Sequence, residues 1–191
     1  LKLPRLPGAH QIENAGTAIA AIRAAGLNLE DAVISRGLEN ARWPARLQRL
    51  TMGPIIELVR ERLGEEPEIW LDGGHNPHAG RAVARAMADM ESRHSKPLLM
   101  ISGMQANKDA VGYFTPFGGL AKKVYCVAAD HDGVMKPEDV CKAATKARLN
   151  AESFDTVETA FGAACADANE PPRFLISGSL YLAGEILRDN A

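Results

Sequence analysis

The stretch EIWLDGGHNP, residues 68–77, most restricts how this chain can fold. The apolar run at 69–71 is typical of a buried strand, and Asp72 stands where that strand should end. Two glycines then allow a tight turn, and Pro77 suits the first turn of a helix. The stretch therefore predicts a strand that turns sharply into a helix. Open α/β sheets bind their ligands at corners of this kind, at the carboxyl ends of strands.

The chain after this corner alternates between short apolar runs and helical segments. Such alternation indicates an α/β fold with a mostly parallel sheet that is covered by helices on both faces. We predict strands at 97–102, 123–128, 151–154 and 173–176, and helices at 77–93, 108–120 (broken), 136–149, 157–169 and 179–190.

The chain before the corner is less regular. Ala-rich spacing predicts a helix at 10–26, and a second, shorter helix is expected at 29–38. A domain boundary is expected at 39–45, and LQRL, residues 47–50, is a candidate first strand. Residues 51–67 fit either a helix or an edge strand, and we expect a hairpin-like excursion there.

Bulk properties place the chain among globular proteins with one core and a small appendage. The net charge is −2 over 191 residues, which gives no reason to expect nucleic acid or an anionic membrane as a partner. No apolar run approaches the roughly 18 residues of a membrane span. Three widely spaced cysteines and no visible signal peptide predict reduced thiols and a cytoplasmic protein. Because the chain begins with Leu1, we expect that it is processed, tagged or cut from something longer.

Asp72, His75 and His78 form the pattern DxxHxxH across the corner. Aspartate and histidine are metal ligands, so a metal site is one interpretation. Asp72 as the cap of the following helix is a second. In a third, the carboxylate accepts hydrogen bonds from ribose hydroxyls or orients an arginine, while the helix N-terminus faces phosphate.

Three other stretches carry polar groups with more than one interpretation. Lys108 follows a strand end and either meets an anion or lies at a solvated helix end. Ser179, in SGS at 177–179, either belongs to a loop that approaches a ligand or simply caps its helix. His10 and Asn14 lie one turn apart on one helix face. No Walker A sequence is present, so no P-loop lies in these residues.

Taken in order, LPGAHQIENA, RWPARLQ, WLDGGHNPHA, ISGM followed by KD, and SGSLYLAGE resemble one family. This is the bifunctional dihydrofolate synthase/folylpolyglutamate synthase family of the Mur ligase superfamily. The resemblance covers nearly the whole chain but only the latter part of such an enzyme. It implies that residues 1–40 are the closing helices of a central ATPase domain and that 41–191 are the C-terminal Rossmann-like domain.

The resemblance implies an ATP-dependent ligase that adds L-glutamate to dihydropteroate or folate through an acyl phosphate. ATP and Mg²⁺ are the implied cofactors, with the magnesium ligands in a preceding P-loop domain that is also the implied partner of this chain. A monomer is expected, and the fragment alone is expected to be inactive. The implied roles are as follows: Asn14 contacts the nucleotide, Arg46 its phosphates, and Asp72 the ribose or Arg46. His75 lies near the reaction centre and the incoming glutamate, Ser179 contacts the glutamate, and Asp72 and His75 are the implied catalytic residues.

Two other functions remain open at this point. One is a stand-alone Rossmann-like module that binds a nucleotide or a partner protein. The other is a Mur-type ligase with a different acceptor, such as a cell-wall precursor. By resemblance, the SGSLYLAGE ending favours the folate branch.

Overall fold

The computed structural model describes residues 1–190 and is built around one six-stranded sheet with the order β1-β2-β6-β3-β4-β5. β1 runs antiparallel to β2, and the other neighbouring strands are parallel. β3 and β6 are buried along their whole length and form the centre of the sheet. The strands are β1 (Gln48–Leu50), β2 (Glu68–Leu71), β3 (Leu98–Ser102), β4 (Ala121–Cys126), β5 (Ala151–Ser153) and β6 (Arg173–Ser177).

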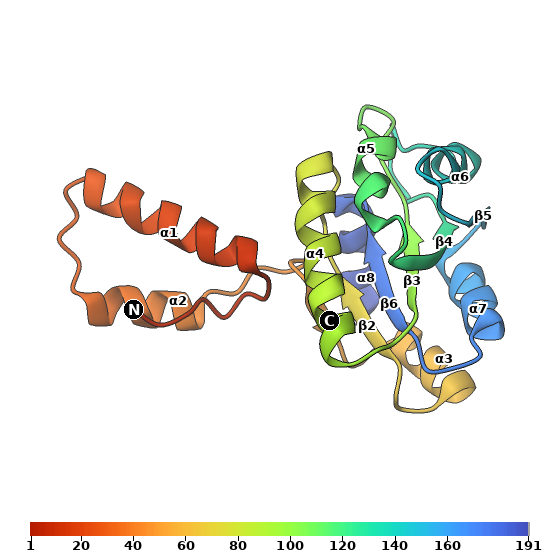
Figure 1. Ribbon diagram of the computed structural model, residues 1–191, viewed down its shortest axis with the longest axis horizontal. Helices are drawn as coiled ribbons and strands as arrows, with labels where there is room; N and C mark the ends of the chain where they lie inside the picture. Colours follow the sequence, from red (N-terminus) through yellow and green to blue (C-terminus); the bar gives the residue numbers. More distant parts are fainter. Residues whose placement is uncertain (191) are drawn as a thin grey trace.

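Helices cover both faces of the sheet, which confirms the predicted α/β fold (Figure 1). On one face lie α3 (Pro54–Leu63), α7 (Val157–Asp167) and α8 (Leu180–Asn190). On the other lie α4 (Pro77–Arg93), α5 (Ala110–Phe114) and α6 (Pro137–Lys146). A 3₁₀ turn, η1 (Thr115–Phe117), follows α5 directly, so the broken helix predicted at 108–120 is confirmed. Each face of the sheet has its own apolar cluster, and the strands separate the two.

A pair of helices projects from this body as an arm, α1 (Ala9–Ala24) and α2 (Asp31–Asn40) (Figure 1). Both helices were predicted. Within them only Gln11 and Ile34 are buried, and the arm meets the body where α1 contacts α4. Several large apolar side chains of the arm and its loop are exposed: Ile12, Leu27, Leu29 and Val33.

The hairpin-like excursion expected at 51–67 is wrong, because α3 occupies most of that segment. Its apolar residues have helical spacing and bury Ile55, Ile56 and Val59 against the sheet. A distant residue also stabilises the start of the helix, since the Asn190 side chain accepts a hydrogen bond from the backbone N–H of Ile55 at 3.0 Å. Among residues 1–190, no helix combines the length and the apolar character that crossing a membrane requires.

Candidate functional site

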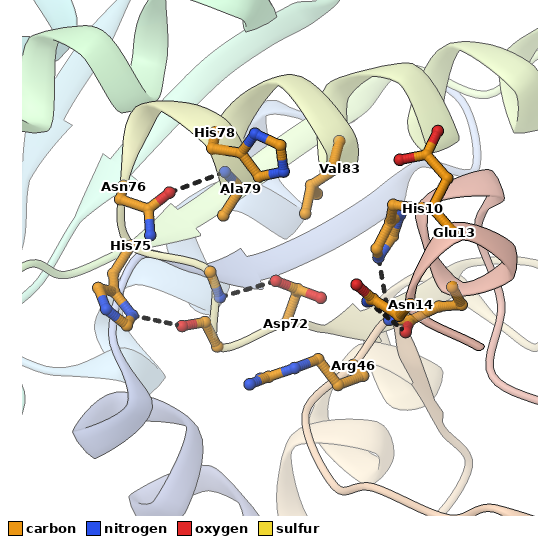
Figure 2. Close-up of a pocket in the computed structure, with 14 residues that line it drawn as sticks. His10, Glu13, Asn14, Arg46, Asp72, His75, Asn76, His78, Ala79 and Val83 are labelled. Atoms are coloured by element: carbon orange, nitrogen blue, oxygen red, sulfur yellow. Dashed lines mark hydrogen bonds between the residues drawn. The ribbon is translucent and has the colours of Figure 1, made fainter. Parts of the chain in front are cut away.

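Asp72 follows β2 directly and is only 3% exposed. One carboxylate oxygen accepts the N–H of Gly74 at 2.7 Å (Figure 2), and the other accepts the N–H of Leu47 at 2.9 Å. Asp72 therefore does not cap α4, which corrects the second interpretation of its role. Asn76 is the cap, because its side-chain oxygen accepts the N–H of Ala79 at 2.9 Å. The Asp72 carboxylate instead ties the loop before β1 to the corner after β2.

Opposing effects act on the pKa of Asp72. Burial raises the pKa of its carboxyl above the ordinary 3.8, while the two backbone N–H groups and the positive charge of Arg46 act to lower it. The charge of Arg46 thus acts on Asp72 across the corner. A carboxylate that already accepts two N–H groups keeps further lone pairs for a ligand hydroxyl or a guanidinium.

Arg46 is held at the cavity by an unusual backbone. Its two neighbours, Ala45 and Leu47, have φ values of 53° and 45°, in the left-handed region that costs most residues about 1–2 kcal/mol. Both neighbours are buried. One guanidinium nitrogen donates to the carbonyl oxygen of Ala45 at 3.1 Å. The remaining N–H groups of Arg46 can therefore serve a ligand, as a planar fork suited to phosphate or carboxylate.

The first turns of α1 supply a chain of three polar side chains. The Asn14 amide donates to the Gln11 side-chain oxygen at 3.0 Å, and the Gln11 amide nitrogen lies 3.0 Å from Nε2 of His10. Burial lowers the pKa of His10 below 6.5, which favours a neutral ring whose Nε2 accepts from Gln11. Gln11 thereby orients both of its neighbours.

His75 lies on the corner itself. Its Nδ1 lies 2.9 Å from the carbonyl oxygen of Gly73, so Nδ1–H donates there and Nε2 remains as an acceptor. Figure 2 shows His75 and His10 on opposite sides of Asp72. In the described part of the chain, residues 1–190, no group of three or more His, Cys, Asp or Glu side chains is arranged to hold a metal ion. The DxxHxxH pattern therefore does not assemble a metal centre there.

These elements enclose a cavity of about 220 Å³ between α1 and the first turn of α4. Four of the predicted residues line it: Asn14, Arg46, Asp72 and His75. Other polar side chains also line it, and they are His10, Gln11, Glu13, Asn76 and His78. Of these, only His78 was considered as a ligand, for a metal ion. Gln11 is adjacent to His10 in a stretch already recognised as a polar helix start, but its burial could be seen only in the folded chain.

Ser179 does not line this cavity. It is 2% exposed, and its hydroxyl oxygen accepts the N–H of Tyr181 at 3.1 Å, as the cap of α8. A backbone hydrogen bond of 3.0 Å from Gly178 to Gly74 links the loop of Ser179 to the corner. The interpretation of Ser179 as a helix cap is thus met, and its contact with glutamate stays a prediction. Lys108 lies next to Asp109, the cap of α5, and its contact with an anion likewise stays a prediction.

Comparison with known proteins adds independent evidence. The family model of the Mur ligase, glutamate ligase domain matches residues 56–180. The dihydrofolate synthase/folylpolyglutamate synthase of Escherichia coli is 29% identical over 98% of this chain and 39% of that protein. The structure of E. coli FolC in complex with DHPP and ADP has a TM-score of 0.77 at 28% identity, covering 98% of this chain and 40% of that one. A bifunctional folylpolyglutamate synthase/dihydrofolate synthase with Mn, AMPPNP and L-glutamate bound has a TM-score of 0.75 at 26% identity, covering 98% and 41%.

The chain spans about two fifths of the length of these relatives. The family model covers well over half of the chain, from within α3 to the first residue of α8, and it includes the corner with Asp72 and His75. The family resemblance predicted from the five motifs is thereby confirmed. The chain belongs to the Mur ligase, glutamate ligase domain family.

Proposed function

We propose that this chain is the C-terminal part of an ATP-dependent ligase that adds L-glutamate to dihydropteroate, to folates or to both. The reaction proceeds through an acyl phosphate that the glutamate amine attacks. The observation that carries this proposal is the cavity in which Asn14, Arg46, Asp72 and His75 meet, in a member of this ligase family. Two similar proteins hold ADP or AMPPNP, and one of these also holds L-glutamate.

The size of the cavity supports a shared site. Pockets that bind small molecules typically hold about 300–1,000 Å³. The cavity here measures about 220 Å³, so it forms one wall of a nucleotide site rather than the whole of it. We assign the other wall to a preceding P-loop domain. Residues 1–40 then belong to the central ATPase domain, and 41–191 form the C-terminal domain. The exposed apolar side chains of the arm support this division, because they offer a surface for such a domain to cover.

The donor and acceptor groups fit a nucleotide triphosphate. The Arg46 guanidinium is always charged and pairs with phosphate oxygens. The side-chain amide nitrogen of Asn14 donates to Gln11, which leaves the side-chain oxygen of Asn14 as an acceptor for a base or a ribose. Asp72 retains lone pairs for ribose hydroxyls and keeps the Arg46 loop in place through Leu47. ATP supplies the activated phosphoryl group, and these three residues hold it in line.

The remaining residues are assigned to the incoming glutamate. His75 presents Nε2 as an acceptor from the corner, where it meets the amine or orients it toward the reacting carbonyl. The Ser179 hydroxyl accepts from α8 but still has its own O–H to donate to a glutamate carboxylate. Mg²⁺ is expected for the reaction, and we place its ligands outside this chain. No step is assigned to a metal ion held by residues 1–190.

The test is turnover of ATP with dihydropteroate and glutamate, measured as ADP release. We compare this chain alone with the longer protein that carries it. Only the longer protein should turn over, and Arg46→Ala in it should lower kcat by about 10²–10³-fold, the usual loss for a group that stabilises transition-state charge. Asn14→Ala should raise the KM for ATP, and it avoids any folding defect because Asn14 is exposed.

Asp89→Ala, an exposed change on α4, is the matched control and should leave turnover unchanged. Ligation by the 191-residue chain alone would contradict the shared site. Full activity of Arg46→Ala would contradict the assigned role of Arg46. If the longer protein showed no turnover with any folate acceptor, it would share only its fold with the ligases.

A further inference from the structure

A second and larger cavity lies at the neck between the arm and the body. It measures about 510 Å³, and it is bounded by the N-terminal segment around Arg5, the linker around Trp43 and strand β1. β1 is the edge strand of the sheet, paired on one side only. Arg46 lines both this groove and the candidate site, so the two cavities lie next to each other at this residue. We call this second cavity the neck groove.

The neck groove is lined by positive side chains and by no carboxylate. Four arginines line it, Arg5, Arg42, Arg46 and Arg49, and no aspartate or glutamate does. None of the four takes part in a salt bridge among residues 1–190. The charge of Arg49 helps to lower the pKa of Glu68, but the Glu68 carboxylate already forms a salt bridge of 2.9 Å with buried Arg173. In a chain whose net charge is −2, such a cluster indicates an anionic ligand.

The aromatic residues of the groove point to a ligand with apolar length as well as charge. Both tryptophans of the chain, Trp43 and Trp70, line the groove. Trp43 is 65% exposed, although an indole normally buries most of its surface. The Trp70 indole N–H donates to Glu68 at 3.1 Å, which keeps its ring in place. Flat apolar surfaces between guanidinium groups suit methylene segments that alternate with carboxylates.

We propose that the neck groove binds the oligo-γ-glutamyl tail of the product, a flexible chain of carboxylates joined by methylene groups. This inference rests on the proposed function, because a ligase that adds glutamate repeatedly must accommodate a tail that gains one carboxylate in each cycle. With Arg46 assigned to the phosphates of ATP, three guanidiniums remain in the groove, and they match several separate carboxylates, whereas a nucleotide concentrates its charge in one triphosphate. The shared Arg46 places the groove beside the site at which the next glutamate would be added.

The groove provides its own reporter, because both tryptophans of the chain line it. Tetra-γ-L-glutamate titrated into the 191-residue chain should change tryptophan fluorescence to saturation. The affinity should fall as salt rises, because the contacts are between charges. Arg42→Ala and Arg49→Ala should each weaken binding by about tenfold, the loss of one charge-assisted pair. Arg188→Ala, an exposed arginine on α8 outside the groove, is the matched control and should bind as the unchanged chain does.

Other ligands separate the alternatives. Monomeric glutamate should bind far more weakly than the tetramer. Saturation by ATP but not by tetra-γ-glutamate would overturn the proposal in favour of a nucleotide groove. Equal affinities for tetra-γ-glutamate and an α-linked tetraglutamate peptide would overturn the proposal in favour of an acidic protein segment. An affinity for tetra-γ-glutamate that is unchanged in both arginine variants would also overturn it.

Turnover separates this inference from the proposed function. In the longer protein that carries this chain, Arg42→Ala should leave the first addition to dihydropteroate unchanged and slow additions to triglutamyl and tetraglutamyl acceptors. Equal rates on all acceptor lengths would overturn the groove alone. If the longer protein ligates nothing, the proposed function fails, and the binding titration still decides whether the groove takes a polycarboxylate.

Discussion

Arg46 owes its position to backbone conformations that most residues avoid. Ala45 and Leu47 both have positive φ, and a buried carboxylate from Asp72 accepts the N–H of Leu47 and so holds the turn. The strain is therefore balanced by a contact that forms only when β1 and β2 pair. Strained residues of this kind gather at sites where a side chain must be held in place.

The protonation of His10 is a prediction at this scale. Burial lowers the pKa of His10 in the folded chain, so the unfolded chain binds more protons as pH falls below 6.5. The contribution of the neutral His10 ring to the free energy of unfolding is therefore complete above pH 6.5. It is lost as pH falls through the lower pKa of the folded chain. An NMR titration of the His10 ring should give a midpoint below 6.5. Gln11→Ala should move the midpoint upward, because it removes a bond that the neutral ring accepts. A midpoint at or above 6.5 would show that the ring is solvated.

Glu68 tests a buried ion pair. Burial alone would raise its pKa, but hydrogen bonds from Trp70 and Arg173 outweigh burial and hold it below 4.5. Glu68→Gln should cost about 1.5–3 kcal/mol in urea unfolding at pH 7, because buried Arg173 loses the nearer of its two carboxylate partners. The difference from the unchanged chain should shrink as pH falls below 4.5, where this stabilisation is lost. Glu91→Gln, with a longer and more exposed contact to Arg173, should cost less than about 1 kcal/mol. Equal costs for both variants would contradict the assignment.

At the scale of elements, α4 and α5 pack closely enough to need a glycine. A Cβ on Gly80 would meet the backbone carbonyl of Tyr113, which cannot rotate away as a side chain can. This contact sets how near the first turns of α4 lie to α5, and so where the corner and its cavity sit relative to the sheet.

A pair of alanine substitutions tests this packing. Gly80→Ala should destabilise the protein by about 1–3 kcal/mol, since the two helices must separate. Gly184→Ala, in the middle of α8 with no atom within 4 Å of the added Cβ, should stabilise it by about 0.5–1 kcal/mol through helix propensity. Both are measured by urea denaturation. If both substitutions changed the free energy of unfolding in the same direction, helix propensity rather than the contact with Tyr113 would determine the effect at Gly80.

At the scale of the whole molecule, the arm and the body differ in how they are held. Both apolar clusters begin at Ala45 or later, so no side chain of α1 or α2 belongs to either cluster, although Ile34 of α2 is buried. The arm nevertheless supplies one wall of the candidate site. Its position is thus more important for function than for the stability of the body.

Removal of the arm tests this division. A chain of residues 41–191 should unfold cooperatively, with a loss below about 2 kcal/mol, because no core residue is removed. Removal of residues 180–190 should abolish cooperative unfolding, because Leu182, Ala183 and Ile186 leave the core. Thermal unfolding followed by circular dichroism measures both. Loss of cooperativity without residues 1–40 would make the arm part of the folding unit.

Local pattern was enough to predict most elements and failed at one place. The runs at 98–101 and 174–176 are apolar throughout and belong to buried strands, as their short length predicts. Residues 51–67 carry both periods, and the start of the helix found there is stabilised by Asn190, which lies 135 positions away and bonds to Ile55. A contact at that separation leaves no trace in a local window of sequence.

The same distinction applies to the candidate site and to the chain as a whole. By itself, the sequence determined the α/β class, the strand-to-helix corner and the polar residues at it, because periodicity and turn chemistry are local properties. Only the tertiary structure decided that Asp72 bonds to Leu47, that Gln11 is buried between its neighbours, and that the arginines of the neck groove meet. These contacts depend on the order of the strands, with β6 between β2 and β3, and on the placement of the arm. Both are set by long-range packing that local periodicity does not encode.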